Sequence, residues 1–181
     1  MALLWHPLGV TWEGQQACFI EPMLLLRTDR LPEGDGWLYE VKFDGYRALA
    51  IKSGGAVRLR SRNDKDFTGR YPGVVAALRV LPDETVIDGE LAALDAAGKP
   101  VFSLLQNGGT NVHFYAFDVL MLGGKDVTGE PFVRRRALLE NHVLPKLSEP
   151  VRCSPVLQGQ LVRPGSVHQS AGPGRTGRQA R

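Results

Sequence analysis

The sequence predicts an α+β fold, on three observations. Segments in which apolar and charged residues alternate, such as 39–44, indicate strands with one buried face. A Ser-Gly-Gly turn between 48–52 and 57–62 is typical of an antiparallel hairpin. In 73–80 the apolar residues recur at helical spacing, which indicates a helix with one buried stripe. The 181 residues are enough for one domain with its own core.

The first predicted strand, 39–44, carries a lysine between two carboxylates. The alternation places Lys42 opposite the apolar set, beside Glu40 and Asp44. One interpretation is a solvated strand edge on which a lysine is paired with acids. The other is a lysine nucleophile, which needs burial or a nearby cation to release its proton, because free lysine has a pKa of about 10.4. The carboxylates stabilise the ammonium, so they suit a nucleophile only if Mg²⁺ occupies them or if they hold the substrate.

The second strand of the hairpin carries a row of arginines. Arg58, Arg60 and Arg62 are spaced by two, which places them on one face of the strand. Such a face is either solvated or directed toward an anion, and the residues alone leave both interpretations open.

Six further elements are predicted along the chain. They are a helix at 73–80, a strand at 85–95, a short helix at 102–107, a strand buried on both faces at 112–122, a helix at 131–142 and a strand at 154–157. In the helix at 131–142 we expect the apolar side chains to face the core. The three consecutive arginines Arg134–Arg136 are expected to face outward, toward solvent or phosphates.

Composition excludes several classes of protein. The chain is 43% hydrophobic and 23% charged, which is an ordinary soluble composition. Cys18 and Cys153 supply neither a disulfide framework nor a cysteine-based zinc site, so we expect a cytoplasmic protein. The apolar run at 1–10 is interrupted and lacks a basic start, so it does not predict a signal peptide. We expect no association with a membrane, because no segment has the length to span one.

The net charge of +3 is concentrated at the C-terminal end. Up to position 149 the sequence has 17 basic and 19 acidic residues, and the remainder has five basic residues and no acidic ones. Basicity suggests a polyanion as partner, but the composition of 1–149 does not by itself establish a basic face.

The segment Glu40–Arg47, which reads Glu-Val-Lys-Phe-Asp-Gly-Tyr-Arg, resembles a known nucleotidyl-transfer motif. The motif, Lys-x-Asp-Gly-x-Arg, is shared by ATP-dependent DNA ligases, RNA ligases and mRNA-capping enzymes. The resemblance implies that Lys42 attacks the α-phosphorus of a nucleoside triphosphate and carries the nucleotide as a phosphoramide.

Further segments extend the resemblance over 19–157. Phe19–Met23 and Leu31–Trp37 are similar to the entry of the adenylation domain in bacterial end-joining DNA ligases. The segments Ser61–Asp64, Asp88–Leu91 and Phe114–Asp118 resemble later motifs of the same family. A carboxylate on a strand can accept a ribose hydroxyl or bind a metal, and a neighbouring glycine lets a ligand approach the backbone. An aromatic ring can stack on a purine, which contributes about 1–3 kcal/mol.

The resemblance implies an adenylation domain with an ATP-grasp-like fold, in which antiparallel sheets with flanking helices hold the nucleotide. It assigns Lys42 as the nucleophile, Glu40 to the adenine side, Asp44 and Arg47 to orienting the lysine and the phosphates or ribose, Arg62 to the ribose-phosphate side, Glu90 to the ribose hydroxyl or the metal, and Phe117 to stacking on adenine. ATP and Mg²⁺ are the implied cofactors. Nicked or broken double-stranded DNA is the implied partner, with a DNA end-binding protein as a further one.

The resemblance stops beyond Leu157. Residues 1–18 form an unassigned lead-in, and 158–181 are expected to be disordered because they are rich in Gly, Arg, Gln and Pro. The family continues with Glu-Gly-x-x-x-Lys, a strand bearing two lysines and an oligonucleotide-binding-fold domain, none of which follows here. We therefore expect a reading frame interrupted near Gln158. We expect adenylation to be reduced by orders of magnitude or absent, and nicks not to be sealed, because the lysines that would compensate charge on the phosphates are missing.

Two alternatives to a DNA ligase stay open. The first is another nucleotidyltransferase of the same superfamily, an RNA ligase or a capping enzyme. The second is a remnant without enzymatic activity that binds a nucleotide or a DNA end.

Overall fold

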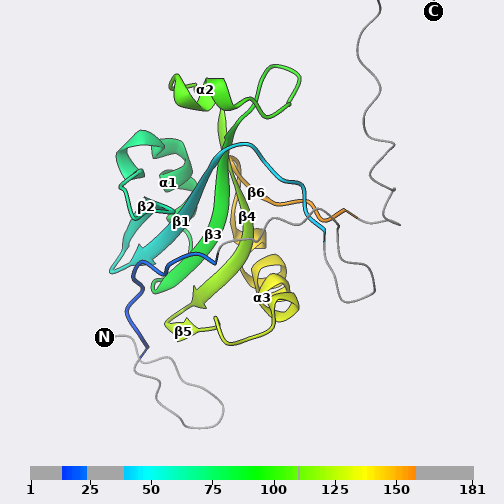
Figure 1. The fold of residues 1–181 in the computed structure, drawn as a ribbon. Helices are drawn as coiled ribbons and strands as arrows, with labels where there is room; N and C mark the ends of the chain where they lie inside the picture. The colour runs from blue at the N-terminus through cyan, green and yellow to red at the C-terminus, as the bar shows by residue number, and fades with distance from the viewer. Residues whose placement is uncertain (1–13, 24–38, 110, 158–181) are drawn as a thin grey trace, which may run out of the picture.

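The computed structural model describes residues 14–23, 39–109 and 111–157 (Figure 1). In this part of the chain six strands form one sheet in the order β2-β1-β3-β4-β5, and β6 also pairs with β4. Helices flank the sheet, so the α+β prediction is confirmed. The predictions for Leu31–Trp37 and for the tail 158–181 lie outside the described residues.

The predicted hairpin is present. β1 (Tyr46–Ser53) and β2 (Ala56–Ser61) pair antiparallel, and the turn between them contains Gly54 and Gly55. These glycines have φ of 56° and 79°, in the left-handed region that residues with a side chain rarely adopt. The Gly-Gly pair therefore sets where the chain reverses.

Two long strands form the centre of the sheet. β3 (Thr85–Ala93) pairs antiparallel with β1 on one side and with β4 (Val112–Leu122) on the other. Nearly every residue of both strands is buried, which confirms the prediction that 112–122 is covered on both faces. The Asp-Gly-Glu sequence lies inside β3, as predicted.

The outer edge of β4 is shared by two short strands. β5 (Lys125–Asp126) pairs antiparallel near the end of β4, and β6 (Val151–Cys153) pairs parallel with 114–116. The expectation of purely antiparallel pairing is therefore wrong at β6. The strand predicted at 154–157 was also misplaced, because in that segment Val156 forms only an isolated bridge with Glu40.

The predicted helices are confirmed with small shifts in their ends. They are α1 (Pro72–Leu78), α2 (Phe102–Gln106) and α3 (Phe132–Leu138), preceded by the short helix η1 (Thr68–Arg70). The chain continues α3 as a π-helical turn η2 (Leu139–Val143) and a 3₁₀ turn η3 (Leu144–Lys146).

Each face of the sheet has its own apolar core. On the helical face Leu59, Leu91 and Phe114 pack with Leu78 of α1 and Leu139 of η2, and all five are fully buried. On the opposite face the segment 14–23 supplies the cover: Ala17, Phe19 and Ile20 pack against Leu49, Ile51, Val86, Leu120 and Met121. The segment 14–23 thus forms part of the core, and burial of these side chains ties it to the sheet.

The strand predicted at 39–44 is not a regular strand. After the bridge between Glu40 and Val156, residues 41–45 have no regular secondary structure, and 38% of the surface of Val41 is exposed. An extended loop can show the same alternation as a strand. The prediction failed because, among the described residues, only 39–41 pair with a neighbouring segment, 155–157, and the pairing does not continue along the loop.

Close packing explains the glycine of the Asp-Gly-Glu sequence. A Cβ atom on Gly89 would lie 2.5 Å from Cζ of Phe114 and 2.7 Å from the carbonyl oxygen of Tyr115. The sequence suggested that this glycine leaves room for a ligand. The structure corrects that interpretation, because the ring of Phe114 fills the space.

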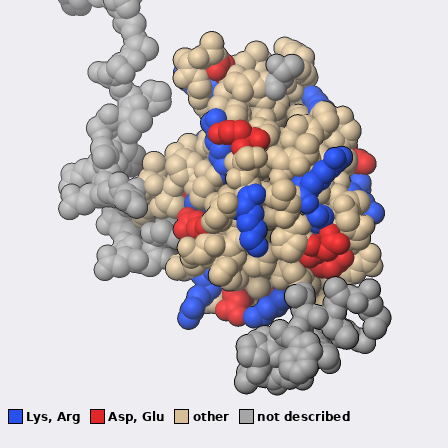
Figure 2. Space-filling model, turned by 180° about the vertical axis from the view of Figure 1, so that it is seen from behind, with Lys and Arg blue, Asp and Glu red and all other residues tan. Residues whose placement is uncertain are grey.

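The described residues contain no helix with the length and apolar character to cross a membrane. On the face in Figure 2, basic side chains lie among acidic ones and form no continuous patch of one sign.

Substituting Gly89→Ala should destabilise the fold. The added methyl group has to displace a buried ring or the β4 backbone, and such overpacking costs about 1–3 kcal/mol. Denaturant titration should give this loss in the free energy of unfolding. Gly73→Ala in the first turn of α1 is the matched control, because nothing lies within 4 Å of its added Cβ. The control should change stability by less than about 1 kcal/mol, and an equal loss in both variants would contradict the steric explanation.

Candidate functional site

The loop that carries Lys42 lies against the sheet. The backbone N–H of Val41 donates to the carbonyl oxygen of Pro155 at 3.5 Å, and the ring of Phe43 stacks on Tyr115 of β4, with centroids 4.0 Å apart. Lys42 lies between these two anchors and is exposed. The loop therefore presents an accessible amine from a backbone held on both sides.

At Gly45, where the loop joins β1, the backbone passes close to β3. A Cβ atom on Gly45 would overlap the carbonyl oxygen of Leu91, so only glycine permits this approach. In the next two positions the pairing is regular, and Arg47 lies directly opposite Glu90. Antiparallel pairing thus places the end of the Lys-x-Asp-Gly-x-Arg motif beside the Asp-Gly-Glu motif.

Arg47 is fixed by a buried carboxylate. Its Nε and Nη2 donate to the two carboxylate oxygens of Asp88 at 3.1 and 2.7 Å, and its Nη1 donates to the carbonyl oxygen of Met23 at 2.8 Å. Burial raises the pKa of Asp88, and the Arg47 guanidinium opposes that shift. Sequence reasoning gave Asp88 no role. The available signal was an aspartate in a fully buried strand, which requires a cationic or hydrogen-bonding partner.

Glu90 has a strongly shifted acidity. Burial raises the pKa of its carboxyl group to about 7, and the nearby Asp88 and Asp44 carboxylates act in the same direction. Arg47 and the backbone N–H of Gly45 act in the opposite direction. Near neutral pH this group is therefore able to hold a proton or to receive a cation.

A cavity of about 810 Å³ opens beside Arg47 and Glu90. Its lining residues are Gly45, Tyr46, Arg47, Ser61, Arg62, Asn63, Lys65, Phe67, Arg70 and Glu90. The structure thus brings three predicted site residues around one space and adds two cations that the sequence reasoning missed, Lys65 and Arg70. Four basic side chains against one carboxylate suit an anionic ligand.

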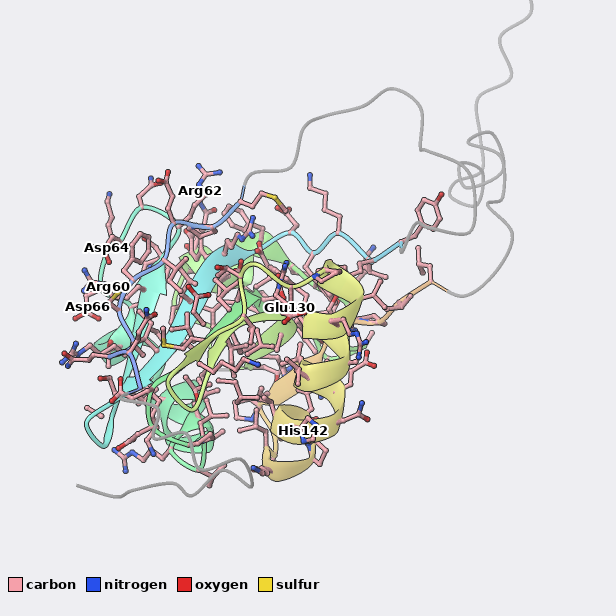
Figure 3. All side chains as sticks on the ribbon, turned by 90° about the horizontal axis from the view of Figure 1, so that it is seen from below. Arg60, Arg62, Asp64, Asp66, Glu130 and His142 are labelled. Carbon is pink, nitrogen blue, oxygen red and sulfur yellow. The ribbon has the colours of Figure 1, made fainter. Side chains whose placement is uncertain are left out.

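The other predicted site residues lie outside this lining. Lys42 and Asp44 are exposed on the neighbouring loop, Glu40 lies at the start of that loop, and Phe117 contacts the lining residue Arg47. A second cavity, of about 480 Å³, lies between β5 and α3 and includes Glu130 and His142 (Figure 3). None of the predicted site residues lines it.

The row of arginines predicted on β2 is divided. Arg60 donates from Nε to Asp64 Oδ1 at 2.7 Å and lies 4.0 Å from Asp66, and Figure 3 shows these three residues together. Arg62 lies beyond the end of β2, where its backbone N–H donates to the carbonyl oxygen of Arg47 at 3.2 Å. Arg60 therefore belongs to a surface ion pair, and Arg62 belongs to the cavity.

Phe117 is placed by an irregularity in β4. Asp88 of β3 pairs with Asp118 and the next residue, Gly89, pairs with Ala116, so Phe117 is an extra residue without a partner on β3. A bulge of this kind redirects a side chain. Phe117 is only partly buried in an otherwise buried stretch of β4, and the Arg47 guanidinium lies 5.3 Å from its ring centroid.

The prediction that Arg134–Arg136 face outward is wrong for two of the three. Arg135 pairs with Asp118, with 2.7 Å between Nη2 and Oδ2, and Arg136 is only 4% exposed and donates from Nη1 to Glu40 Oε1 at 2.6 Å. A buried carboxylate on β4 and a partly buried one on the Lys42 loop attract these side chains inward, because an unpaired buried charge is costly. Arg134 is exposed, as predicted.

The described residues contain no cluster of three or more His, Cys, Asp or Glu side chains that could hold a metal ion. Mg²⁺ in nucleotide sites is commonly bound by one or two carboxylates together with substrate phosphates. Glu90, one carboxylate beside a cavity suited to anions, fits that arrangement.

Comparisons with known proteins identify the family of this chain. The profile of one family, the ATP dependent DNA ligase domain, matches residues 22–159. The multifunctional non-homologous end joining protein LigD of Mycobacterium bovis is 48% identical over 107 residues, which are 58% of this chain and 14% of that protein. LigD of Pseudomonas aeruginosa is 37% identical over 145 residues, which are 77% of this chain and 17% of that protein. The chain thus spans less than a fifth of these relatives.

A solved structure is similar as well. A mycobacterial DNA ligase D complexed with ATP and MES has 42% sequence identity and a TM-score of 0.61, and the match covers 68% of this chain and 41% of that one. The family match includes the Lys42 loop, the Asp-Gly-Glu strand and the bulge at Phe117. The chain therefore belongs to the ATP-dependent DNA ligase domain family.

Proposed function

We propose that this chain binds ATP in the cavity beside Arg47 and Glu90 and that Lys42 accepts the adenylate, as the first step of DNA ligation. The observation that carries the proposal is the pairing of β1 with β3, which sets Arg47 opposite Glu90 at the mouth of a cation-lined cavity. The similar mycobacterial ligase structure that contains ATP supports the same choice of nucleotide.

The proposed step is a displacement at phosphorus. The neutral amine of Lys42 attacks the α-phosphorus, a P–N bond forms, and the bond from the α-phosphorus to the bridging oxygen breaks, so that pyrophosphate leaves. The proton lost from the amine passes to solvent. The AMP then passes to a DNA 5′-phosphate, from which a 3′-hydroxyl displaces it as the strand is sealed.

Residues of the cavity stabilise the charge that develops in this step. Arg62, Lys65 and Arg70 line the cavity and are placed to bind phosphate oxygens, while Asp88 holds Arg47 in position. Glu90 would hold Mg²⁺ together with phosphate oxygens, or would accept the ribose hydroxyl. When bound, Mg²⁺ would neutralise charge on the triphosphate.

The remaining residues would bind the base and orient the amine. Phe117 would stack on adenine, because the bulge of β4 leaves its ring partly exposed. Glu40 would lie at the adenine side, and Asp44 would orient Lys42. We assign these roles to one adenylation domain at 19–157, which the family match to 22–159 supports.

The wider proposal concerns the substrate and its setting. The relatives are named for non-homologous end joining, which supports broken or nicked double-stranded DNA as the substrate. We place the reaction in the cytoplasm, where bacterial DNA lies, without a membrane, and we include a protein that binds the DNA ends as a partner.

Labelling with ATP tests the assignment of Lys42. The wild-type chain, incubated for hours with α-labelled ATP and Mg²⁺, should form a covalent adduct that resists alkali and is cleaved by acid, as a phosphoramide is. Lys42→Ala should abolish the adduct and change ATP affinity only a few-fold. Lys99→Ala, an exposed lysine in a turn, is the control and should label like wild type.

Two outcomes would contradict the proposal in different ways. Binding of ATP without an adduct at Lys42 would favour a nucleotide-binding module without turnover. No binding of ATP would refute the nucleotide site itself.

Because the pKa of Glu90 is raised, the substitution Glu90→Gln should increase the free energy of unfolding by an amount that depends on pH. The pKa of Glu90 in the folded state, about 7, lies above the usual glutamate value of 4.5, so wild-type stability falls as the pH rises through this interval and stays low above it. At about pH 8 the variant should therefore gain roughly 1–2 kcal/mol in free energy of unfolding, allowing for solvent screening of a partly exposed group. At about pH 4 it should gain little.

Denaturant titrations at both pH values measure this gain. Glu130→Gln, an exposed glutamate outside the site, controls for the removal of one negative charge. An equal effect of Glu90→Gln at the two pH values would show that its acidity is not shifted by the fold.

A further inference from the structure

The side chain of Arg136 is buried and fully hydrogen-bonded. A guanidinium has five N–H donors, and the structure provides an acceptor for each of them. Nε donates to Glu140 Oε1 at 2.6 Å. Nη1 donates to Glu40 Oε1 at 2.6 Å and to the carbonyl oxygen of Phe117 at 3.2 Å. Nη2 donates to Cys153 Sγ at 2.9 Å and to the carbonyl oxygen of Ser154. This set of contacts leaves the guanidinium no freedom to rotate alone.

Besides Glu140 of η2, the acceptors belong to three other parts of the structure. Glu40 begins the Lys42 loop and is 96 residues away from Arg136, Phe117 is the bulged residue of β4, and Cys153 ends β6. The guanidinium is planar and rigid, so it fixes these groups relative to one another. One nitrogen, Nη1, contacts both residues that are proposed to lie against the base.

The contact leaves one oxygen of Glu40 available. Only Oε1 accepts a hydrogen bond from Arg136, and the described residues donate none to Oε2. The side chain of Glu40 is 25% exposed. Burial raises the pKa of Glu40, and the Arg136 guanidinium opposes that rise. Arg136 therefore favours the ionised carboxylate, which only accepts hydrogen bonds.

An ionised carboxylate distinguishes between the two purines. Adenine presents an amino donor at its six position, whereas guanine presents a carbonyl acceptor there. A carboxylate fixed beside that position attracts the first group and repels the second.

We propose that Arg136 is a positioning residue for adenine recognition, which directs Glu40 and Phe117 at the base without contacting the nucleotide. This inference rests on the proposed ATP site. It assigns selectivity for the base to a buried side chain of α3, outside the sequence segments that carry the resemblance to nucleotidyltransferases.

Equilibrium binding of three nucleotides tests the proposal. ATP, GTP and purine riboside triphosphate, which lacks the amino group, are titrated against wild type, Arg136→Lys, Arg136→Met, Glu40→Gln and the double variant Glu40→Gln/Arg136→Met. Wild type should prefer ATP to purine riboside triphosphate by about tenfold, the effect of one hydrogen bond to a charged group. Arg136→Met should lose most of this preference, and Arg136→Lys should retain part of it, because an ammonium keeps the charge but has only three donors.

The double variant separates positioning from general support of the fold. If Arg136 acts through Glu40, Arg136→Met should change the preference no further once Glu40 is replaced by Gln. Arg134→Met, an exposed arginine of the same helix, is the control and should keep the wild-type preference. If Arg136→Met does not fold, Glu140→Gln weakens one contact of Arg136 at a half-exposed residue and should shift the preference in the same direction by a smaller factor.

The outcomes are distinguishable from failure of the proposed function. Wild type that does not bind ATP overturns the ATP site and this inference together. Wild type that binds ATP overturns only the inference if it shows no preference over purine riboside triphosphate, if Arg136 variants weaken all three nucleotides by one common factor, or if Glu140→Gln leaves the preference unchanged.

Discussion

The pairing of β1 with β3 joins two motifs that are far apart in the sequence, and a buried charge pair fixes them there. Arg47 lies opposite Glu90 and forms a salt bridge with Asp88, whose side chain is almost completely buried. A buried carboxylate without a partner is costly, so neither side chain can turn away without the other. This arrangement fixes Arg47 and Glu90 at the cavity, and Arg62, Lys65 and Arg70 supply its excess of positive charge.

A second buried arginine acts in the same way at the other end of the Lys42 loop. Arg47 attaches the end of the loop to β3, and Arg136 attaches its beginning to β4 and β6. Between them, the contacts among the described residues include a ring stack of Phe43, a backbone hydrogen bond of Val41 and the close approach of Gly45 to β3, rather than a continuous strand ladder. Such a segment opens more easily than the central strands, and local mobility of this kind suits a group that has to approach a substrate.

Sequence patterns predicted the elements whose burial follows a local period, such as the buried strand at 112–122. They failed where a distant partner decides the structure. The alternation at 39–44 is compatible with a strand or a loop, and only the neighbouring chain distinguishes them. The inward direction of Arg135 and Arg136 depends on acceptors contributed by other segments. The motifs named several residues at the cavity, but the extra residue in β4 that exposes Phe117 has no local pattern by which it can be recognised.

The extra residue in β4 has a consequence for any attempt to transfer this pocket to another scaffold. Copying the aromatic side chain onto a regular ladder would not reproduce the site, since uninterrupted alternation would direct the ring to the face opposite that of the residues before and after it. The count of residues between two paired positions, rather than the identity of any one of them, is the property that a designer would have to preserve. A deletion of one amino acid there would alter the site more than many substitutions around it.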